Sequence, residues 1–487
     1  MNNSDSTVLS AQNFNNIFER LGERVPLHSL LIYKEGNLLF EKYDPAFDEN
    51  TIHRLFSVSK TLTAIAIGKL ACDGKINLKD RVCTYFPEKF PVPGDEASLH
   101  PWIRETTIEN CLMMRTPHAV TTYRLGGRED YVGSFFTHEP THRPGRIFCY
   151  DTSGSHVLGA LIEKLSGKSI PDFIRDELPD LGLSEDAYFI TDPQGVSLGG
   201  TGLCGASRDL LSLGKFILNA LKEESPFGEF MRKASSCLTS NRVPAPIPGE
   251  SFGYGYYLWR CANDTFMCYG MGGQFVFICP RHKLLMITTA NTQGRAGSNQ
   301  FFHDEFGALV CALDNEAGLS VNAKPSHSFR EGRGVFAPLS VSLEEILSTE
   351  PGCIGAKALK SRINKTYLFT ENEKGFESLT LTDDELILTL REPSPDAPEG
   401  TVGGDIVIPL TEGSEFIFPG IIQRTAAKLE LLSDGTVLLT ISLIDSYLGD
   451  FLLQLSFTDE DLVVFMLKRE ESVLPNFNGQ IYGKIKE

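Results

Sequence analysis

The chain has 487 residues, 41% of them hydrophobic, which is enough apolar material for two or three domains. Its 63 acidic and 45 basic residues give a net charge of -18, which argues against nucleic acid or an anionic membrane as a partner. The 11 cysteines form no Cys-x-x-Cys pair and the 10 histidines no metal-binding motif, so we expect reduced thiols, no metal and no other cofactor.

The first elements predict a mixed α and β fold. Residues 1–7 are polar, with no signal peptide, and no later window reaches membrane-spanning length, so we expect a cytoplasmic protein. Residues 11–25 have the spacing of an amphipathic helix. Residues 27–33 and 38–43 read as two strands, joined by a hairpin turn at 34–37.

A Ser-x-x-Lys motif follows at Ser57 and Lys60, where apolar spacing over 56–70 predicts a helix with one buried face. Ser57 would lie in the first turn, with Lys60 on the same side. A lysine among apolar neighbours loses its charge readily, so it can take the serine proton. The motif is weak alone, because Ser212 and Lys215 repeat it inside a helical pattern, where we expect only a structural role.

A tyrosine stands at the entry of a later helix. Pro144-Gly145 form a turn that delivers Tyr150, and the helix begins near Thr152. A phenol beside a cation ionises more easily, so Tyr150 could act as a base or proton relay for Ser57. The alternative is a tyrosine that only packs.

Three further motifs in the middle of the chain lack the context that their chemistry needs. Gly200 to Gly205 fits Gly-x-Gly-x-x-Gly, but without the strand and acidic residue of a dinucleotide site. Ser197 and Ser251 each fit Gly-x-Ser-x-Gly. Neither has both the preceding strand and the following helix of an esterase elbow, so an α/β-hydrolase is disfavoured.

Residues 254–259, 266–269, 274–279 and 284–291 read as strands, mostly of an antiparallel sheet, and a helix at 302–313 closes the unit. Adjacent glycines before residue 274 would let a ligand approach the backbone closely. The N–H of Gln274 could then point at a reacting oxygen, with a plain turn as the alternative.

Together, Ser57-Val58-Ser59-Lys60, Tyr150 and Gly272-Gly273-Gln274 resemble, in order and spacing, the serine β-lactamase and penicillin-binding protein superfamily. Within it, the chain is most similar to the class C β-lactamase-related esterases, amidases and 6-aminohexanoate-dimer hydrolases. The resemblance covers roughly residues 10–315, and Gly199-Gly200-Thr201-Gly202-Leu203 is a secondary match. It implies an α+β fold, in which an antiparallel sheet is flanked by helices and joined to an all-helical lobe.

Two departures bear on the substrate. Tyr150-Asp151-Thr152 stands where β-lactamases usually have Tyr-x-Asn, and Met271-Gly272-Gly273 where they have Lys-Thr-Gly or His-x-Gly. The resemblance places Thr152 and these three residues beside the bound substrate. The missing lysine or histidine would attract a β-lactam carboxylate, so we expect a small neutral amide, ester or short peptide as substrate.

The resemblance also implies a mechanism. Ser57 attacks the carbonyl carbon, Lys60 and Tyr150 transfer protons, the N–H groups of Ser57 and Gln274 form the oxyanion hole, and water hydrolyses the acyl-enzyme. The alternatives are a true β-lactamase or D-alanyl-D-alanine carboxypeptidase, and a catalytically silent binding or sensing protein of the same fold.

The C-terminal part carries no motif with chemistry. We expect a serine hydrolase domain over 1–320, a linker over 321–350 and a β-rich domain over 351–487. Regular strand spacing, with a hairpin signal at 433–435, predicts a small barrel or sandwich. The seven expected strands are 376–381, 385–391, 405–410, 428–432, 436–444, 449–457 and 461–468. We expect it to stabilise the fold or a homodimer, and a cover over the active-site mouth is the alternative.

Overall fold

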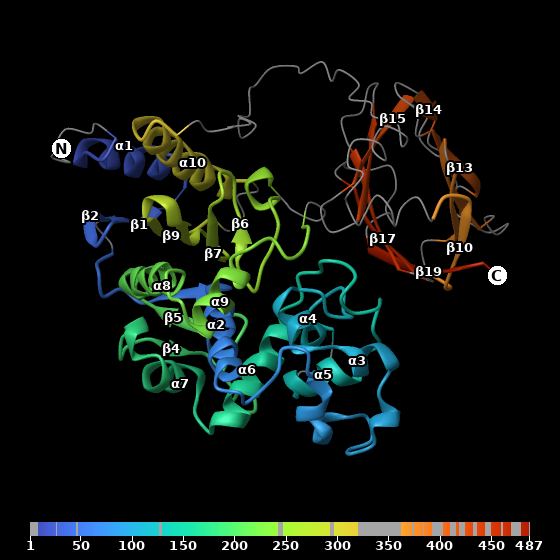
Figure 1. The fold of residues 1–487 in the computed structure, drawn as a ribbon, viewed down its shortest axis with the longest axis horizontal. Coiled ribbons are helices and arrows are strands. Elements are labelled where there is room, and N and C mark those ends of the chain that lie inside the picture. Colours follow the sequence, from blue (N-terminus) through green and yellow to red (C-terminus); the bar gives the residue numbers. More distant parts are fainter. Residues whose placement is uncertain are drawn as a thin grey trace. The chain divides into compact units, whose positions relative to one another are not determined.

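The computed structural model describes residues 8–319 and 362–486, apart from residues 26, 45–46, 126–128, 242–246, 293–296, 373–374, 383, 392–402, 410–414, 418–423, 432–435, 444–449, 459–460 and 469–478. The chain forms two compact units (Figure 1). The first comprises Met1–Thr116, Val120–Glu139 and Cys149–Phe329, and the second Pro117–Ala119, Pro140–Phe148 and Arg330–Glu487. The linker at 321–350 lies outside the described residues, and the three domain boundaries stay a prediction.

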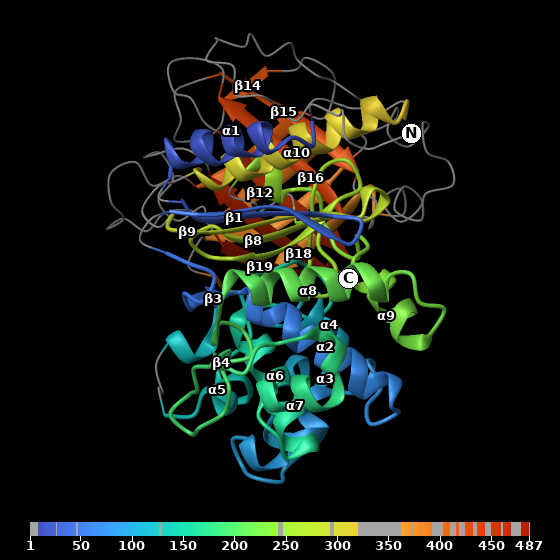
Figure 2. The same ribbon diagram turned by 90° about the vertical axis from the view of Figure 1, so that its left-hand side faces the viewer.

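A six-stranded antiparallel sheet organises the first unit, in the order β2-β1-β9-β8-β7-β6. Helices α1 and α10 cover one face and α8 covers the other (Figure 2). Strands β8 and β9 are buried along their whole length, so they lack the alternation of a half-exposed strand. The strands are β1 (Leu27–Lys34), β2 (Asn37–Tyr43), β6 (Trp259–Arg260), β7 (Phe266–Gly270), β8 (Gln274–Cys279) and β9 (Leu284–Ala290).

The N-terminal predictions are confirmed. Helix α1 (Ala11–Gly22) is capped by the Ser10 side chain and buries one apolar face. β1 and β2 pair through a two-residue turn, in which Glu35 and Gly36 both have positive φ, 51° and 99°. Two left-handed residues match the twist of a tight hairpin.

Helices and a small antiparallel sheet, β3-β5-β4, make up the rest of the unit. The predicted strand 254–259 is wrong, because only Trp259 belongs to β6 and Tyr257 has φ 56°, which no regular strand accommodates. The elements are β3 (His53–Phe56), β4 (Tyr188–Phe189), β5 (Leu203–Gly205), α2 (Val58–Cys72), α3 (Pro101–Glu105), α4 (Ile108–Leu112), α5 (Tyr131–Thr137), α6 (Thr152–Ser166), α7 (Ile170–Glu177), α8 (Ser207–Ala220), α9 (Pro226–Ala234) and α10 (Asn299–Glu316).

Helix α2 differs from the prediction of one buried face, because 12 of its 15 residues are buried. It contacts α6, α7, α9 and β7, which surround it. Small residues permit this packing, and a Cβ added to Gly68 would overlap the ring of Phe230. The helix that begins after Ser57 is therefore the central core element of its lobe.

The second unit contains a ten-stranded antiparallel sheet, in the order β13-β12-β11-β10-β19-β18-β17-β16-β15-β14, curved into a half-barrel (Figure 1). All seven predicted strands are present, while β10, β14 and β19 were not predicted. The hairpin signal at 433–435 lies outside the described residues. The strands are β10 (Lys365–Phe369), β11 (Phe376–Leu381), β12 (Glu385–Leu390), β13 (Gly404–Pro409), β14 (Glu415–Ile417), β15 (Arg424–Leu431), β16 (Val437–Leu443), β17 (Asp450–Phe457), β18 (Asp461–Lys468) and β19 (Gly479–Ile485).

The fold class is thus as predicted, a mixed α and β unit with antiparallel sheets and a C-terminal all-β unit. Within the described ranges, no helix combines the length and apolar character needed to cross a membrane.

Candidate active site

Ser57 lies at the junction of β3 and α2. Phe56 before it has φ 45°, so the chain turns sharply between strand and helix. Ser57 occupies the N-cap position, yet its side chain makes no capping hydrogen bond. The hydroxyl of Ser59 takes the structural role, because it bonds the carbonyl of Phe56 and accepts from the N–H of Leu203 on β5. The partly exposed Ser57 hydroxyl is left available for chemistry.

The Lys60 ammonium group contacts this hydroxyl directly. Its Nζ lies 3.1 Å from Ser57 Oγ, 2.8 Å from the carbonyl oxygen of Gly200 and 3.4 Å from Thr152 Oγ1. Only 1% of the residue is exposed. Burial lowers the pKa of Lys60 to about 7, against an opposing effect of Asp151. Lys60 is therefore poised to exchange a proton with Ser57 near neutral pH.

Tyr150 contacts both Ser57 and Lys60. Its hydroxyl is hydrogen-bonded to Ser57, and Lys60 Nζ lies 4.8 Å from the centre of its ring. The ring stacks on Trp259 at 5.5 Å, which fixes its plane. Burial raises the pKa of Tyr150 and the bond to Ser57 only partly offsets this, so the phenol keeps its proton at neutral pH. Asp151 next to it caps α6 through the N–H groups of Ser153 and Gly154.

A buried carboxyl group acts on this tyrosine. The charge of Glu250 raises the pKa of Tyr150 further, and burial raises the pKa of Glu250 itself to about 7. Asn299 Nδ2 lies 3.4 Å from Glu250 Oε1 and donates to the hydroxyl of Tyr269 at 2.7 Å. The sequence analysis missed Glu250, because no motif marks it.

The turn between β7 and β8 adjoins the serine strand. Gln274 pairs with Gly270, and a Cβ on Gly270 would overlap the carbonyl oxygen of Leu55, two residues before Ser57. Gly273 has φ 94°, and a Cβ there would lie 2.9 Å from that of Ala290. The Gln274 side chain donates to the carbonyl of Ala290 at 2.7 Å, which ties the start of β8 to β9.

The structure thus brings Ser57, Lys60, Tyr150 and Thr152 into direct contact. Gln274 pairs with Gly270, which packs against Leu55 of β3, and Met271 is 47% exposed at the turn. The oxyanion role of Gln274 and the substrate-binding roles of Met271, Gly272 and Gly273 stay predictions. The carbonyl of Gly200 is a site atom that we had not assigned. A Cβ there would overlap Ser155 and Thr152, so the glycine run was a signal for close approach to the site.

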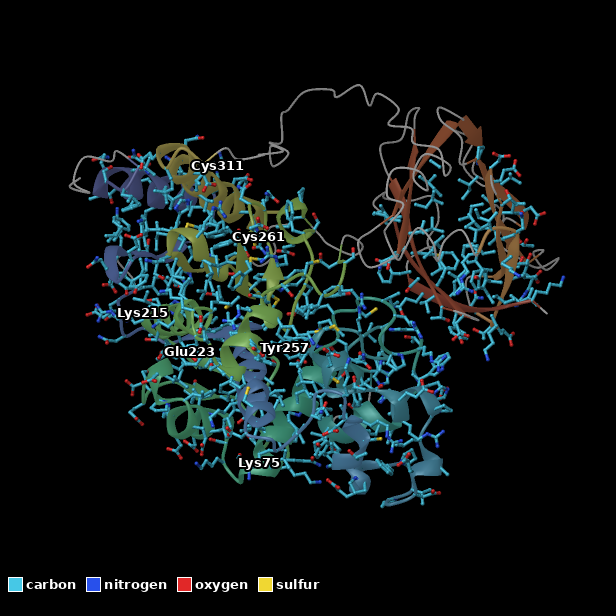
Figure 3. All side chains as sticks on the ribbon, viewed as in Figure 1. Lys75, Lys215, Glu223, Tyr257, Cys261 and Cys311 are labelled. Carbon is cyan, nitrogen blue, oxygen red and sulfur yellow. The ribbon has the colours of Figure 1, made fainter. Side chains whose placement is uncertain are left out.

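The competing motifs are not part of this cluster. Ser197 is 2% exposed, and Ser251 donates to the carbonyl of Pro248. The second Ser-x-x-Lys motif, Ser212 and Lys215, lies on α8. Figure 3 shows Lys215 away from Tyr257, which lies in the middle of the unit. A Cβ on Gly214 would lie 2.8 Å from Leu285, so this motif serves packing. Among the described residues, no three acidic, histidine or cysteine side chains gather as metal ligands.

The family model described as Beta-lactamase matches residues 14–301, a stretch that contains every residue of this cluster. The chain belongs to the β-lactamase family. Penicillin-binding protein 4* of Bacillus subtilis (strain 168) is 24% identical over 192 residues, 33% of this chain and 38% of that protein. Protein flp of Staphylococcus aureus (strain MW2) is 26% identical over 168 residues, 31% of this chain and 32% of that protein. The chain therefore matches less than two fifths of the length of either curated relative.

Several solved structures share the fold of this β-lactamase-family protein. The octameric penicillin-binding protein homologue from Pyrococcus abyssi has a TM-score of 0.51 and 19% identity, over 97% of this chain and 98% of that chain. EstCE1, a hydrolase with promiscuous acyltransferase activity, has a TM-score of 0.50 and 18% identity, over 61% and 98%. The superfamily resemblance inferred from the three motifs is confirmed.

Proposed function

We propose that this β-lactamase-family protein is a serine hydrolase that cleaves an amide or ester through an acyl-enzyme on Ser57. One observation carries the proposal. The buried Lys60 Nζ lies 3.1 Å from Ser57 Oγ and has a pKa of about 7, so a large share of the amine is neutral at physiological pH. A neutral amine at this distance can take the serine proton as the hydroxyl attacks.

The proton then follows the hydrogen bonds of the cluster. In acylation, Ser57 Oγ bonds to the carbonyl carbon and its proton passes to Lys60. The bond to the leaving group breaks as Tyr150 donates its proton to that group, and Lys60 returns a proton to the phenolate. Because Tyr150 keeps its proton in the resting site, it suits the donor role better than that of first base. In deacylation, water attacks the acyl carbon and gives a proton to the Lys60 and Tyr150 pair. The bond from the acyl carbon to Ser57 Oγ then breaks, and that pair returns a proton to Ser57 Oγ.

Two backbone N–H groups are proposed to stabilise the oxyanion. The N–H of Ser57 lies at the start of α2, where the helix dipole favours negative charge. The second comes from Gln274, whose position beside β3 is fixed by the close packing of Gly270 on Leu55. Gly272 and Gly273 leave room for the substrate backbone, while Thr152 and Met271 contact its sides.

A second candidate activity is β-lactam hydrolysis or D-alanyl-D-alanine carboxypeptidase activity, which the family membership favours. The exposed thioether of Met271 offers no charge to a β-lactam carboxylate, which supports the amidase or esterase ahead of it.

Hydrolysis assays on 4-nitrophenyl esters, small amides and nitrocefin test the proposal. Turnover of an ester or amide should vanish in Ser57→Ala and persist in Ser251→Ala, whose hydroxyl lies outside the cluster. Nitrocefin turnover without ester or amide turnover would reverse the order of the two candidates. Full ester turnover in Ser57→Ala would refute the proposed nucleophile.

A further inference from the structure

Two exposed arginines lie next to the candidate active site. Arg54 is on β3, three residues before Ser57, and Arg124 ends the short 3-10 helix η4 (Thr122–Arg124). Neither forms an ion pair with any carboxylate that the structure describes, although the protein carries 63 acidic and 45 basic residues. Unpaired cations beside a reactive serine are unexpected in such an acidic chain.

Arg54 is held in place along the wall of the site. Its Nε donates to the carbonyl oxygen of Thr201 at 3.3 Å, and Thr201 follows Gly200, whose carbonyl accepts from Lys60. The guanidinium carbon lies 5.0 Å from the ring centre of Phe56. The other N–H donors of Arg54 have no hydrogen-bond partner within the described ranges, so they remain available to a ligand.

Arg124 acts on the same cluster from a different segment. Its charge lowers the pKa of Lys60, and both Arg124 and Arg54 lower the pKa of Tyr123, which burial raises. The hydrogen bonds of this segment place it beside the cluster: Thr121 Oγ1, just before η4, accepts from the N–H of Thr152 at 3.1 Å, and the N–H of Thr122 donates to Ser153 Oγ at 3.3 Å. Because Thr152 Oγ1 lies 3.4 Å from Lys60 Nζ, η4 adjoins the candidate site. Asp151, which opposes the effect of Arg124 on the pKa of Lys60, is fully buried and already accepts hydrogen bonds from α6.

We propose that Arg54 and Arg124 bind a carboxylate of the substrate, so that the enzyme prefers amides or esters that carry one. Guanidinium groups bind carboxylates with paired hydrogen bonds and keep their charge at all physiological pH values. The inference rests on the proposed function and revises the neutral substrate expected from the sequence. It also withdraws Met271 as an argument against a carboxylate-bearing β-lactam, so the ester, amide and nitrocefin assays alone decide between the two candidate activities. The proposal places carboxylate binding on β3 and η4. It does not use the turn before β8, where Met271 stands in place of the lysine or histidine of β-lactamases.

A matched pair of esters tests the preference. Mono-4-nitrophenyl adipate carries a free carboxylate on the acyl side, and its methyl ester is the neutral equivalent. The pair 4-acetoxybenzoate and methyl 4-acetoxybenzoate places the charge on the leaving group. In one of the pairs, kcat/KM should favour the charged ester by about two- to fivefold, as expected for exposed charge pairs.

The preference should fall towards one in Arg54→Gln/Arg124→Gln and shrink at high salt, because salt screens exposed charges. Arg24→Gln is the matched control, since Arg24 is also exposed and stacks on an aromatic ring, Phe301, at 4.5 Å without contacting the cluster. A charge preference that is absent from both pairs, or that survives in the double variant, would overturn the inference.

A binding measurement separates this inference from the proposed function. In Ser57→Ala, which should not turn over, calorimetric titration with the charged ester preferred above gives its affinity directly. Adding Arg54→Gln and Arg124→Gln should raise the Kd by about two- to fivefold, whereas adding Arg24→Gln should not. Equal affinities would refute the role of the arginines. If the two arginine substitutions weaken binding but the native protein turns over no ester, only the proposed hydrolase function is refuted.

Discussion

The buried lysine gives the most quantitative prediction. With a pKa of about 7 for Lys60, the neutral fraction rises from about 9% at pH 6 to about 91% at pH 8. The rate of Ser57 acylation should therefore increase about tenfold over this interval and level off above about pH 9. The assay is the pre-steady-state burst of 4-nitrophenol from 4-nitrophenyl acetate. A rate that is flat over this range, or that has its midpoint near the ordinary lysine pKa of 10.5, would refute the reasoning.

The lowered pKa of Lys60 also predicts that the free energy of unfolding depends on pH. The pKa of Lys60 is lower in the folded chain, so between about pH 7 and 10.5 the unfolded chain holds a proton that the folded chain lacks. Stability then rises with pH through this window, and below it the buried group costs on the order of 4 kcal/mol. Lys60→Met removes this cost but leaves the carbonyl of Gly200 unpaired, which costs about 1–3 kcal/mol.

We therefore expect Lys60→Met to be inactive, yet about 2 kcal/mol more stable than the native protein at pH 7 in urea unfolding. The gain should shrink as the pH approaches the ordinary lysine pKa. A variant that is less stable than the native protein at pH 7 would contradict the account of a costly buried amine.

Other positions give further tests. Gly270→Ala should lower the acylation rate about tenfold and stability by about 1–3 kcal/mol, because the new Cβ overlaps the backbone of β3. An unchanged burst rate would show that the turn between β7 and β8 does not need this close contact with β3. Gly307→Ala on α10, with nothing within 4 Å, is its control and should gain about 0.5–1 kcal/mol. Asp192→Asn should lose about 1–3 kcal/mol at pH 7, because Asp192 lies 3.0 Å from the buried His156. Burial raises the pKa of Asp192, but its hydrogen bonds outweigh this and lower it overall, so its contribution is present above about pH 4 and lost in acid. A loss that is equal in acid and at pH 7 would contradict that assignment.

The sequence predicted best where local chemistry decides the structure. The turn at Glu35 and Gly36, the helix after Ser57 and the seven predicted tail strands follow from turn residues and apolar spacing over short stretches. Residues 254–259 show the opposite case. Their aromatic side chains favour a strand locally, but Tyr257 adopts a positive φ in the core and the chain turns.

The remaining parts of the site depend on contacts distant in sequence. The hydrogen bond from Lys60 to Gly200 joins residues 140 positions apart, and no hydrophobic periodicity in the sequence predicts it. The full burial of α2 depends on neighbours from several later helices, so its own pattern does not reveal a second covered face. Arg124 has no sequence signal, because only the hydrogen bond from the N–H of Thr152 to Thr121 shows that this segment lies against the start of α6.

The measurement that tests the central claim most directly is site mapping with a fluorophosphonate probe. The native protein is labelled across the neutral range, digested, and the modified peptide is identified by mass spectrometry. The account predicts a single adduct on Ser57, formed faster as the pH rises through about 7 and much more slowly in Lys60→Met. An adduct on Ser197 or Ser251, or labelling of Lys60→Met at the native rate, would contradict it.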